Sequence, residues 1–223
     1  MWQLYTFPLC PFSRKVRLLL GEKGVGYDIV RESPWLRRDE FIDMNPAGQT
    51  PVIADPGRGL LLIDSTAICE YFEETVDKAA MINGTAANRA EIRRLVAWFD
   101  DHFHRDVTRP LLTERMEKRL VHHAAPSSTV LREAMKAAVE HLDYTDWMLS
   151  RHSWIAGATM SLADLAAAAH ISIADYLGGI DWKNHEETAR WYRGFKSRPT
   201  MRALLAERME VIGPPKHYDD PDF

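Results

Sequence analysis

Four short apolar runs, separated by turn residues, mark the first 75 residues of the chain. Each run is rich in β-branched or large apolar residues and is bounded by glycine, proline or charged residues, as strands are. A turn at 56–57 between the last two runs is short enough for an antiparallel hairpin. The runs are WQLYT at 2–6, GYDIV at 26–30, PVIA at 51–54 and LLLI at 60–63.

Helical spacing appears between and after these runs. Residues 11–23 begin with proline and repeat apolar residues every three or four positions. Residues 38–44 form a short helix before an Asn-Pro break, and residues 64–76 begin with the capping residues Asp-Ser-Thr. The order β-α-β-α-β-β-α predicts a four-stranded mixed sheet with helices on its faces over residues 1–76.

From residue 86 the strand signal stops, and apolar residues such as Phe103 and Val107 recur at helical spacing. Residues 161–175 are nearly all apolar, which predicts a helix buried on every side and opened by a capping box at Ser161. The pattern therefore predicts an α+β chain. Its further parts are a linker at 77–85, an all-helical domain at 86–210 and an extended tail at 211–223.

Composition excludes several classes of function. The 223 residues carry a net charge of −4, which gives no electrostatic footprint for nucleic acid. No apolar run approaches the length of a transmembrane helix, and the first ten residues lack the features of a secretory signal. Two cysteines make no disulfide framework, and no His-Glu-x-x-His or paired-cysteine spacing indicates a metal site. We expect a cytoplasmic protein with no metal and no nucleic-acid or membrane partner.

Cys10 directly precedes a predicted helix that begins with Pro11. Backbone N–H groups at a helix start stabilise a thiolate, and Ser13, one turn further on, is placed to donate to it. Cys10 and Ser13 are therefore a candidate catalytic pair. The alternative is that Cys10 is a small buried residue beside a helix start. Cys69, inside the helix at 64–76, is expected to be buried.

Two further junctions carry candidate chemistry. Thr50-Pro51 opens a predicted strand, which favours a cis peptide bond and leaves the Thr50 backbone facing outward to pair with an extended peptide. The alternative is a proline that merely ends a loop. Asp64 and Ser65 stand where a strand passes into a helix, so backbone donors and the Ser65 hydroxyl can hold a carboxylate. The alternative there is a plain N-cap.

These three motifs occur in the order and spacing of one family, and the chain resembles the glutathione transferase superfamily over roughly residues 2–210. The resemblance implies a thioredoxin-like N-terminal domain followed by an all-helical domain. It implies that Cys10 is the active-site residue of a cysteine-type transferase. The glutathione-binding residues that it implies are Thr50 and Pro51 for the cysteinyl backbone, Asp64 and Ser65 for the γ-glutamyl end, and Arg37 for the glycyl carboxylate.

Longer segments, among them FIDMNPAGQTPVIA, DSTAICEYFEETV and PPKHYDDPDF, are similar to glutathione-transferase-like cell-division proteins of alphaproteobacteria. That resemblance implies a cytoplasmic homodimer, at the division site, that binds filaments of the tubulin-like protein FtsZ, with glutathione chemistry absent or vestigial. The expected dimer surface includes Ile68, Tyr71, Phe72 and residues 93–98. The alternative is an active cysteine-type glutathione transferase or thiol transferase, with glutathione as substrate and no bound cofactor.

Two segments are candidate partner contacts. Trp35 is a large apolar residue in a turn flanked by charge, and the end of the chain is acidic and carries two aromatics. Aromatics are enriched at binding hot spots because they bury much area for few rotors. Removing residues 216–223 would then weaken FtsZ binding without changing stability. The alternative is that the aromatics fold back onto the protein. The candidate tail residues are Tyr218, Asp219, Asp220, Asp222 and Phe223.

Overall fold

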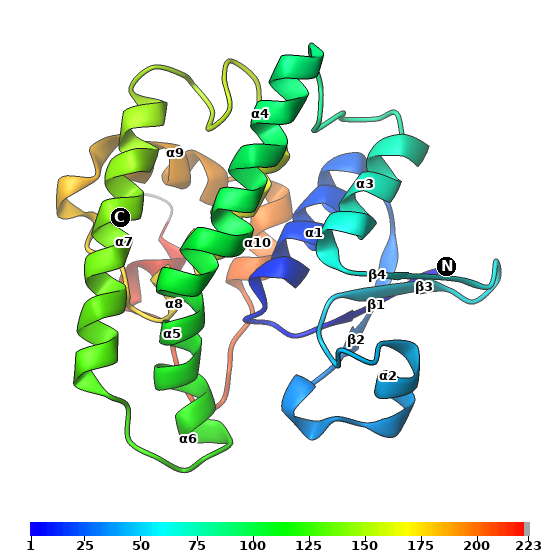
Figure 1. The fold of residues 1–223 in the computed structure, drawn as a ribbon, viewed down its shortest axis with the longest axis horizontal. Helices are drawn as coiled ribbons and strands as arrows, with labels where there is room; N and C mark the ends of the chain where they lie inside the picture. Colours follow the sequence, from blue (N-terminus) through cyan, green and yellow to red (C-terminus); the bar gives the residue numbers. More distant parts are fainter. Residues whose placement is uncertain (221–223) are drawn as a thin grey trace. The chain divides into compact units, whose positions relative to one another are not determined.

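The computed structural model describes residues 1–220 (Figure 1). The chain divides into two compact units, Met1–Met81 and a second unit that begins at Ile82. The boundary falls inside the stretch 77–85, where the sequence lacks both strand and helix patterning.

One four-stranded sheet forms the centre of the first unit. Parallel pairing joins β1 to β2, whereas β1 and β3, and β3 and β4, pair antiparallel. The order across the sheet is β2-β1-β3-β4, so the predicted mixed sheet is confirmed. The strands are β1 (Trp2–Thr6), β2 (Tyr27–Arg31), β3 (Val52–Asp55) and β4 (Leu60–Ile63).

Helices cover both faces of this sheet, because alternate residues of a strand point to opposite sides. Trp2 of β1 contacts Phe72, with ring centroids 5.2 Å apart, whereas Tyr5 contacts Phe41 at 5.9 Å on the other face. The helix that carries Phe72 packs beside the first helix of the unit (Figure 1). The helices are α1 (Pro11–Lys23), α2 (Asp39–Met44) and α3 (Ser65–Thr75).

Burial on α3 corrects the expected dimer surface. Ile68 and Phe72 are 0% and 1% exposed, and Cys69 beside them is also buried. Residues one turn apart share one face of a helix, and this face of α3 is turned toward the core. Ile68 and Phe72 thus present almost no surface to a second copy, and of the three α3 residues expected there, Tyr71 alone retains partial exposure.

The second unit is helical over most of its described length. Two π-helical stretches, Trp98–Thr108 and Thr113–Glu117, join its first three helices, and 3-10 turns occur at Trp182–Asn184 and Lys216–Asp219. Extended pairing in residues 82–220 is limited to single bridges within two tight turns. The predicted change from strands to helices is thus confirmed. The helices are α4 (Ala86–Ala97), α5 (Arg109–Leu112), α6 (Lys118–Leu120), α7 (Ser128–Leu149), α8 (Leu162–Tyr176), α9 (Glu186–Lys196) and α10 (Pro199–Leu205).

Every residue of α8 is buried, as its apolar run predicted. The predicted capping box is present: Asp164 accepts hydrogen bonds from the backbone N–H groups of Ser161 and Ile155, each at 2.9 Å. Burial raises the pKa of the Asp164 carboxyl to about 6, and these hydrogen bonds oppose that shift.

Candidate functional site

Cys10 is the N-cap of α1, and its thiol lies between two backbone groups. The Sγ atom accepts from the N–H of Ser13 at 3.4 Å and donates to the carbonyl oxygen of Thr50 at 3.3 Å. Cys10 is partly exposed, whereas Cys69 is buried. Among the two thiols of the chain, Cys10 is therefore the one that solvent reaches.

The expected contact between the Ser13 hydroxyl and Cys10 is wrong. Ser13 is 0% exposed, and its Oγ has no hydrogen-bond partner among residues 1–220. Ser13 occupies the third position of the helix, where the backbone N–H lacks an intrahelical acceptor, so this N–H reaches the sulfur. The hydroxyl is buried and makes no hydrogen bond to the Cys10 sulfur.

The Thr50–Pro51 peptide bond is cis, as predicted. Asn45 holds the preceding loop, since its Nδ2 donates to the carbonyl of Gln49 at 2.8 Å. Gly48 in this loop has φ +65, and a Cβ there would lie 2.9 Å from a side-chain carbon of Ile42. The Thr50 carbonyl does not face outward unpaired, because the Cys10 thiol donates to it. A peptide pairing with Thr50 would have to displace the thiol from that oxygen.

Asp64 caps α3 with its own carboxylate. Oδ1 accepts from the N–H groups of Thr66 at 2.7 Å and Ala67 at 3.2 Å. The residue has φ 76, a conformation that costs about 1–3 kcal/mol for a residue other than glycine. For the Asp64 carboxylate, the plain N-cap alternative describes the geometry, and two backbone donors at this helix start are already used. Ser65 beside it is 4% exposed.

The structure brings four of the predicted glutathione-binding residues to one cavity. This cavity has a volume of 150 Å³, below the roughly 300–1,000 Å³ of ordinary small-molecule sites. Arg37 lies beside the loop that leads to it, with Nη1 3.6 Å from the point where a Cβ on Gly48 would stand. The cavity is lined by Phe12, Asn45, Ala47, Gln49, Thr50, Pro51, Ile63, Asp64 and Ser65.

The turn that carries Trp35 presents a different side chain to solvent. Trp35 packs edge-on against Phe7, with ring centroids 5.0 Å apart, and is only partly exposed. Leu36, the next residue, is 64% exposed. The buried Glu32 holds the turn through an ion pair with Arg38 at 2.6 Å. The sequence did not indicate Leu36 as the exposed apolar residue of this turn. Trp35 is the larger side chain, and its partner Phe7 is distant in the sequence, so the partial burial of Trp35 could not be predicted.

The end of the described chain folds back instead of extending. Tyr218 is 0% exposed and packs edge-on against Tyr176 of α8, with ring centroids 5.1 Å apart. Residues Lys216–Asp219 form a 3-10 turn. The expectation that Tyr218 contacts a partner from an extended tail is therefore wrong, because burial of its ring in the second unit is the arrangement observed. Asp222 and Phe223 lie outside the described residues.

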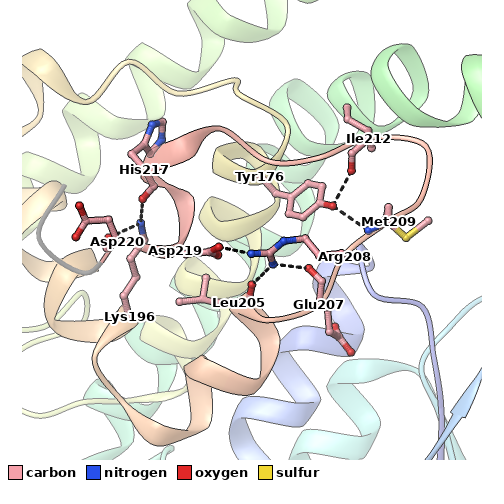
Figure 2. Close-up of polar contacts among 10 residues, drawn as sticks. All are labelled: Tyr176, Lys196, Leu205, Glu207, Arg208, Met209, Ile212, His217, Asp219 and Asp220. Carbon is pink, nitrogen blue, oxygen red and sulfur yellow. Dashed lines mark hydrogen bonds and ion pairs between the residues drawn. The ribbon is translucent and has the colours of Figure 1, made fainter.

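A buried lysine holds this turn in place by hydrogen bonds to its backbone (Figure 2). Lys196 Nζ donates to the carbonyl oxygens of His217 at 3.1 Å and Asp220 at 3.2 Å. It also pairs with the buried Asp175 carboxylate at 3.6 Å, and His217 Nε2 lies 2.8 Å from the other oxygen of Asp175. Burial lowers the pKa of the Lys196 ammonium, and Asp175 opposes this shift. We call Asp175, Lys196, His217 and Tyr218 the clasp.

The other two tail candidates are held near the clasp at the surface. Asp219 forms an ion pair with Arg208, and its side chain is 55% exposed. Asp220 offers its backbone carbonyl to Lys196, and its side chain remains exposed.

Residues 1–220 contain no group of three or more His, Cys, Asp or Glu side chains placed to hold a metal ion. None of the helices in that range is both long enough and apolar enough to cross a bilayer.

A sheet unit with a cysteine at a helix start and a cis-proline loop, followed by a helical unit, defines a glutathione-transferase-like protein. Residues 4–80 match the family model "Glutathione S-transferase, N-terminal domain". The chain is 43% identical to FtsZ-localized protein A of Caulobacter vibrioides over 99% of this chain and 97% of that protein.

Two solved structures are similar over the full length. A glutathione S-transferase from Rhodospirillum rubrum F11 is 44% identical, with a TM-score of 0.97 and complete coverage of both chains. FzlA from C. crescentus is 42% identical, with a TM-score of 0.96 over 100% of this chain and 99% of that one. The chain belongs to the glutathione S-transferase superfamily, in the same family as FtsZ-localized protein A.

Proposed function

We propose that this protein is a cell-division factor with a glutathione transferase fold that binds FtsZ filaments as a homodimer. The observation that carries the proposal is the 43% identity to FtsZ-localized protein A across 99% of the chain. Its place of action is then the division site in the cytoplasm.

The internal pairing of the groups predicted to bind glutathione supports a role in binding a partner protein over a catalytic role. The Thr50 carbonyl accepts the Cys10 thiol, and the Asp64 carboxylate accepts two N–H groups of its own helix. The cavity lined by Thr50 and Asp64 has a volume of 150 Å³. Glutathione would have to break the first of these contacts and enlarge the site, which lowers its affinity.

The alternative function is that of a cysteine-type glutathione transferase or thiol transferase. The partial exposure of Cys10 and the N–H of Ser13 on its sulfur favour it, because a substrate can reach the sulfur and a backbone donor already holds it in place. In thiol transfer, the Cys10 thiolate would attack one sulfur of a glutathione mixed disulfide, and the other sulfur would leave as a thiolate.

Two surfaces are the proposed partner contacts. The first is the turn with Trp35 and Leu36, in which an anchored indole supports an exposed leucine. The second is the acidic end of the chain, where the exposed side chains of Asp219 and Asp220 replace Tyr218 as candidates. The contributions of Asp222 and Phe223 remain part of the proposal.

Co-sedimentation with GTP-assembled FtsZ, paired with calorimetric titration of glutathione, tests the proposed function. We expect the protein to pellet with polymers, Leu36→Asp to reduce pelleting severalfold, and Cys10→Ser to leave it nearly intact. Leu61→Asp is the matched control, because Leu61 is a 39% exposed leucine elsewhere in the first unit. Glutathione binding without polymer binding would reverse the proposal in favour of the transferase.

A further inference from the structure

A groove in the second unit lies between α9, α10 and the final 3-10 turn. Its volume of 670 Å³ falls within the roughly 300–1,000 Å³ of ligand-binding sites, unlike the cavity at Thr50. Leu205 and Ala206 give it an apolar part, and its remaining residues are polar or charged. The groove is lined by Lys196, Ser197, Arg202, Leu205, Ala206, Arg208 and Asp219.

Positive charge exceeds negative charge in this lining. Three cationic side chains face one carboxylate, that of Asp219. Lys196 is neutralised by the buried Asp175, and Arg208 pairs with Asp219. Arg202 is exposed, and within residues 1–220 its guanidinium makes no hydrogen bond or ion pair. Among residues 1–220, no carboxylate pairs with Arg202, so its positive charge is the one that this lining offers to a ligand.

Asp219 shows that the groove accepts a carboxylate. Its carboxylate lies on the guanidinium of Arg208, as Figure 2 shows, while Arg208 also donates to the carbonyl of Glu207 at 2.9 Å. The side chains of Arg208 and Asp219 are 41% and 55% exposed, so solvent reaches their ion pair. Exposed ion pairs contribute little free energy, and a carboxylate from another chain can therefore take the place of Asp219.

We propose that this groove binds an acidic peptide segment of a partner protein. Carboxylates of that segment pair with Arg202 and Arg208, and its apolar atoms pack on Leu205 and Ala206. The chain as a whole carries a net charge of −4 and repels an acidic peptide, so binding has to arise from the local charge of the groove. This inference goes beyond the proposed function and holds whether or not the partner is FtsZ.

Fluorescence anisotropy with the full chain tests the groove, using fluorescein-labelled octaglutamate as the probe and octaglutamine as the neutral comparison. We expect octaglutamate to bind and octaglutamine not to bind. Arg202→Gln should weaken octaglutamate binding about fivefold, the size expected for one exposed ion pair. Asp219→Asn should strengthen it by a similar factor, because it removes the internal competitor. Added salt should weaken the binding.

Matched controls carry the same charge changes outside the groove. Arg132→Gln and Glu133→Gln alter exposed residues of α7 and should leave octaglutamate binding unchanged. Equal binding of the two peptides, or equal weakening by Arg132→Gln and Arg202→Gln, would overturn the proposal. Failure of Asp219→Asn to strengthen binding would also overturn it. These results are independent of FtsZ co-sedimentation, so the two proposals can fail separately.

Discussion

The cavity at Thr50 and the clasp at Lys196 hold polar groups in two different ways. Around Thr50, a thiol, an amide and an exposed carboxylate each pair with a backbone group. The Cys10 thiol reaches Thr50 from 40 residues away, whereas Asn45 and Asp64 bond within their own loops. In the clasp, a lysine and an aspartate that are 2% and 1% exposed neutralise each other, and backbone carbonyls complete the coordination of the ammonium.

This difference indicates that the clasp contributes more to the stability of the fold than the groups at Thr50 do. A buried charge pair is strongly destabilising when one partner is removed, so the clasp makes the end of the chain part of the folded unit. The groups at Thr50 are mostly neutral or solvated, and changing them alters local contacts more than global stability. The end of the chain is therefore structural as far as Tyr218, and the surface beside it is available for binding.

The largest expected effect is the loss of the buried cation. Lys196→Met leaves the Asp175 carboxylate buried without its ammonium partner, and we expect the free energy of unfolding to fall by about 3–5 kcal/mol. Urea denaturation measures this change. Lys136→Met, in an exposed pair with Glu140, is the control and should leave the urea midpoint almost unchanged. Similar midpoints for the two variants would contradict the role given to the clasp.

Removal of residues 216–223 should have the next largest effect. Loss of the buried Tyr218 ring, which packs on Tyr176, should lower the free energy of unfolding by about 3–4 kcal/mol. A thermal scan should show a clear fall in melting temperature, in contrast to the unchanged stability expected from the sequence. Tyr218→Ala in the full chain should reproduce most of that fall. If the truncated chain had the same melting temperature as the full chain, the packing of Tyr218 would contribute little to stability.

Acidification should destabilise the second unit through His104. Burial first, and then the charges of His170 and Arg109, lower the pKa of His104 to about 4. A lowered pKa gives stability that is present above pH 6.5 and is lost as the pH falls toward 4, in total about 3 kcal/mol. Asp164, with its raised pKa of about 6, acts in the opposite direction. Its contribution to the free energy of unfolding is present below about pH 4 and is lost as the pH rises to 6.

The difference between the wild type and His104→Gln isolates the histidine. Urea midpoints at pH 7 and pH 4.5 should show a smaller acid-induced loss in the variant. An equal fall in the urea midpoint of both proteins would mean that protonation of His104 does not destabilise the second unit.

The smallest expected effect lies beside the cavity. Ser13→Ala removes a buried hydroxyl without a hydrogen-bond partner and places a better helix former in α1. We expect stabilisation by about 1 kcal/mol, measured by urea denaturation, and unchanged alkylation of Cys10. A slower reaction of Cys10 with iodoacetamide would indicate that the hydroxyl does assist the thiolate.

The sequence alone was sufficient for the elements whose pattern is local. Alternating or apolar runs placed the four strands, and the cap residues Ser161 and Asp64 placed the starts of two helices. The cis bond before Pro51 followed from its position at a strand start. In each case the deciding residues lie within a few positions of each other.

Contacts between distant residues could not be predicted in this way. Tyr218 is buried because Lys196, 21 residues before His217, fixes the turn and because Tyr176 of α8 receives the ring. The inward direction of the Ser13 side chain depends on the packing of α1 in the first unit. The π-helical stretch at Trp98–Thr108 keeps the apolar spacing of an ordinary helix, so no sequence signal distinguished it.

The complete enclosure of α8 has a consequence for how this protein tolerates change. On α7, exposed positions such as Met135 and Val139 alternate with buried ones such as Ala138. Tolerance to substitution along α7 should therefore vary with the period of the helix. Along α8 tolerance should show no such period, since no position from Leu162 to Tyr176 faces solvent. A library of random single variants, sorted for folded protein, should show α8 as an unbroken band of fifteen intolerant positions.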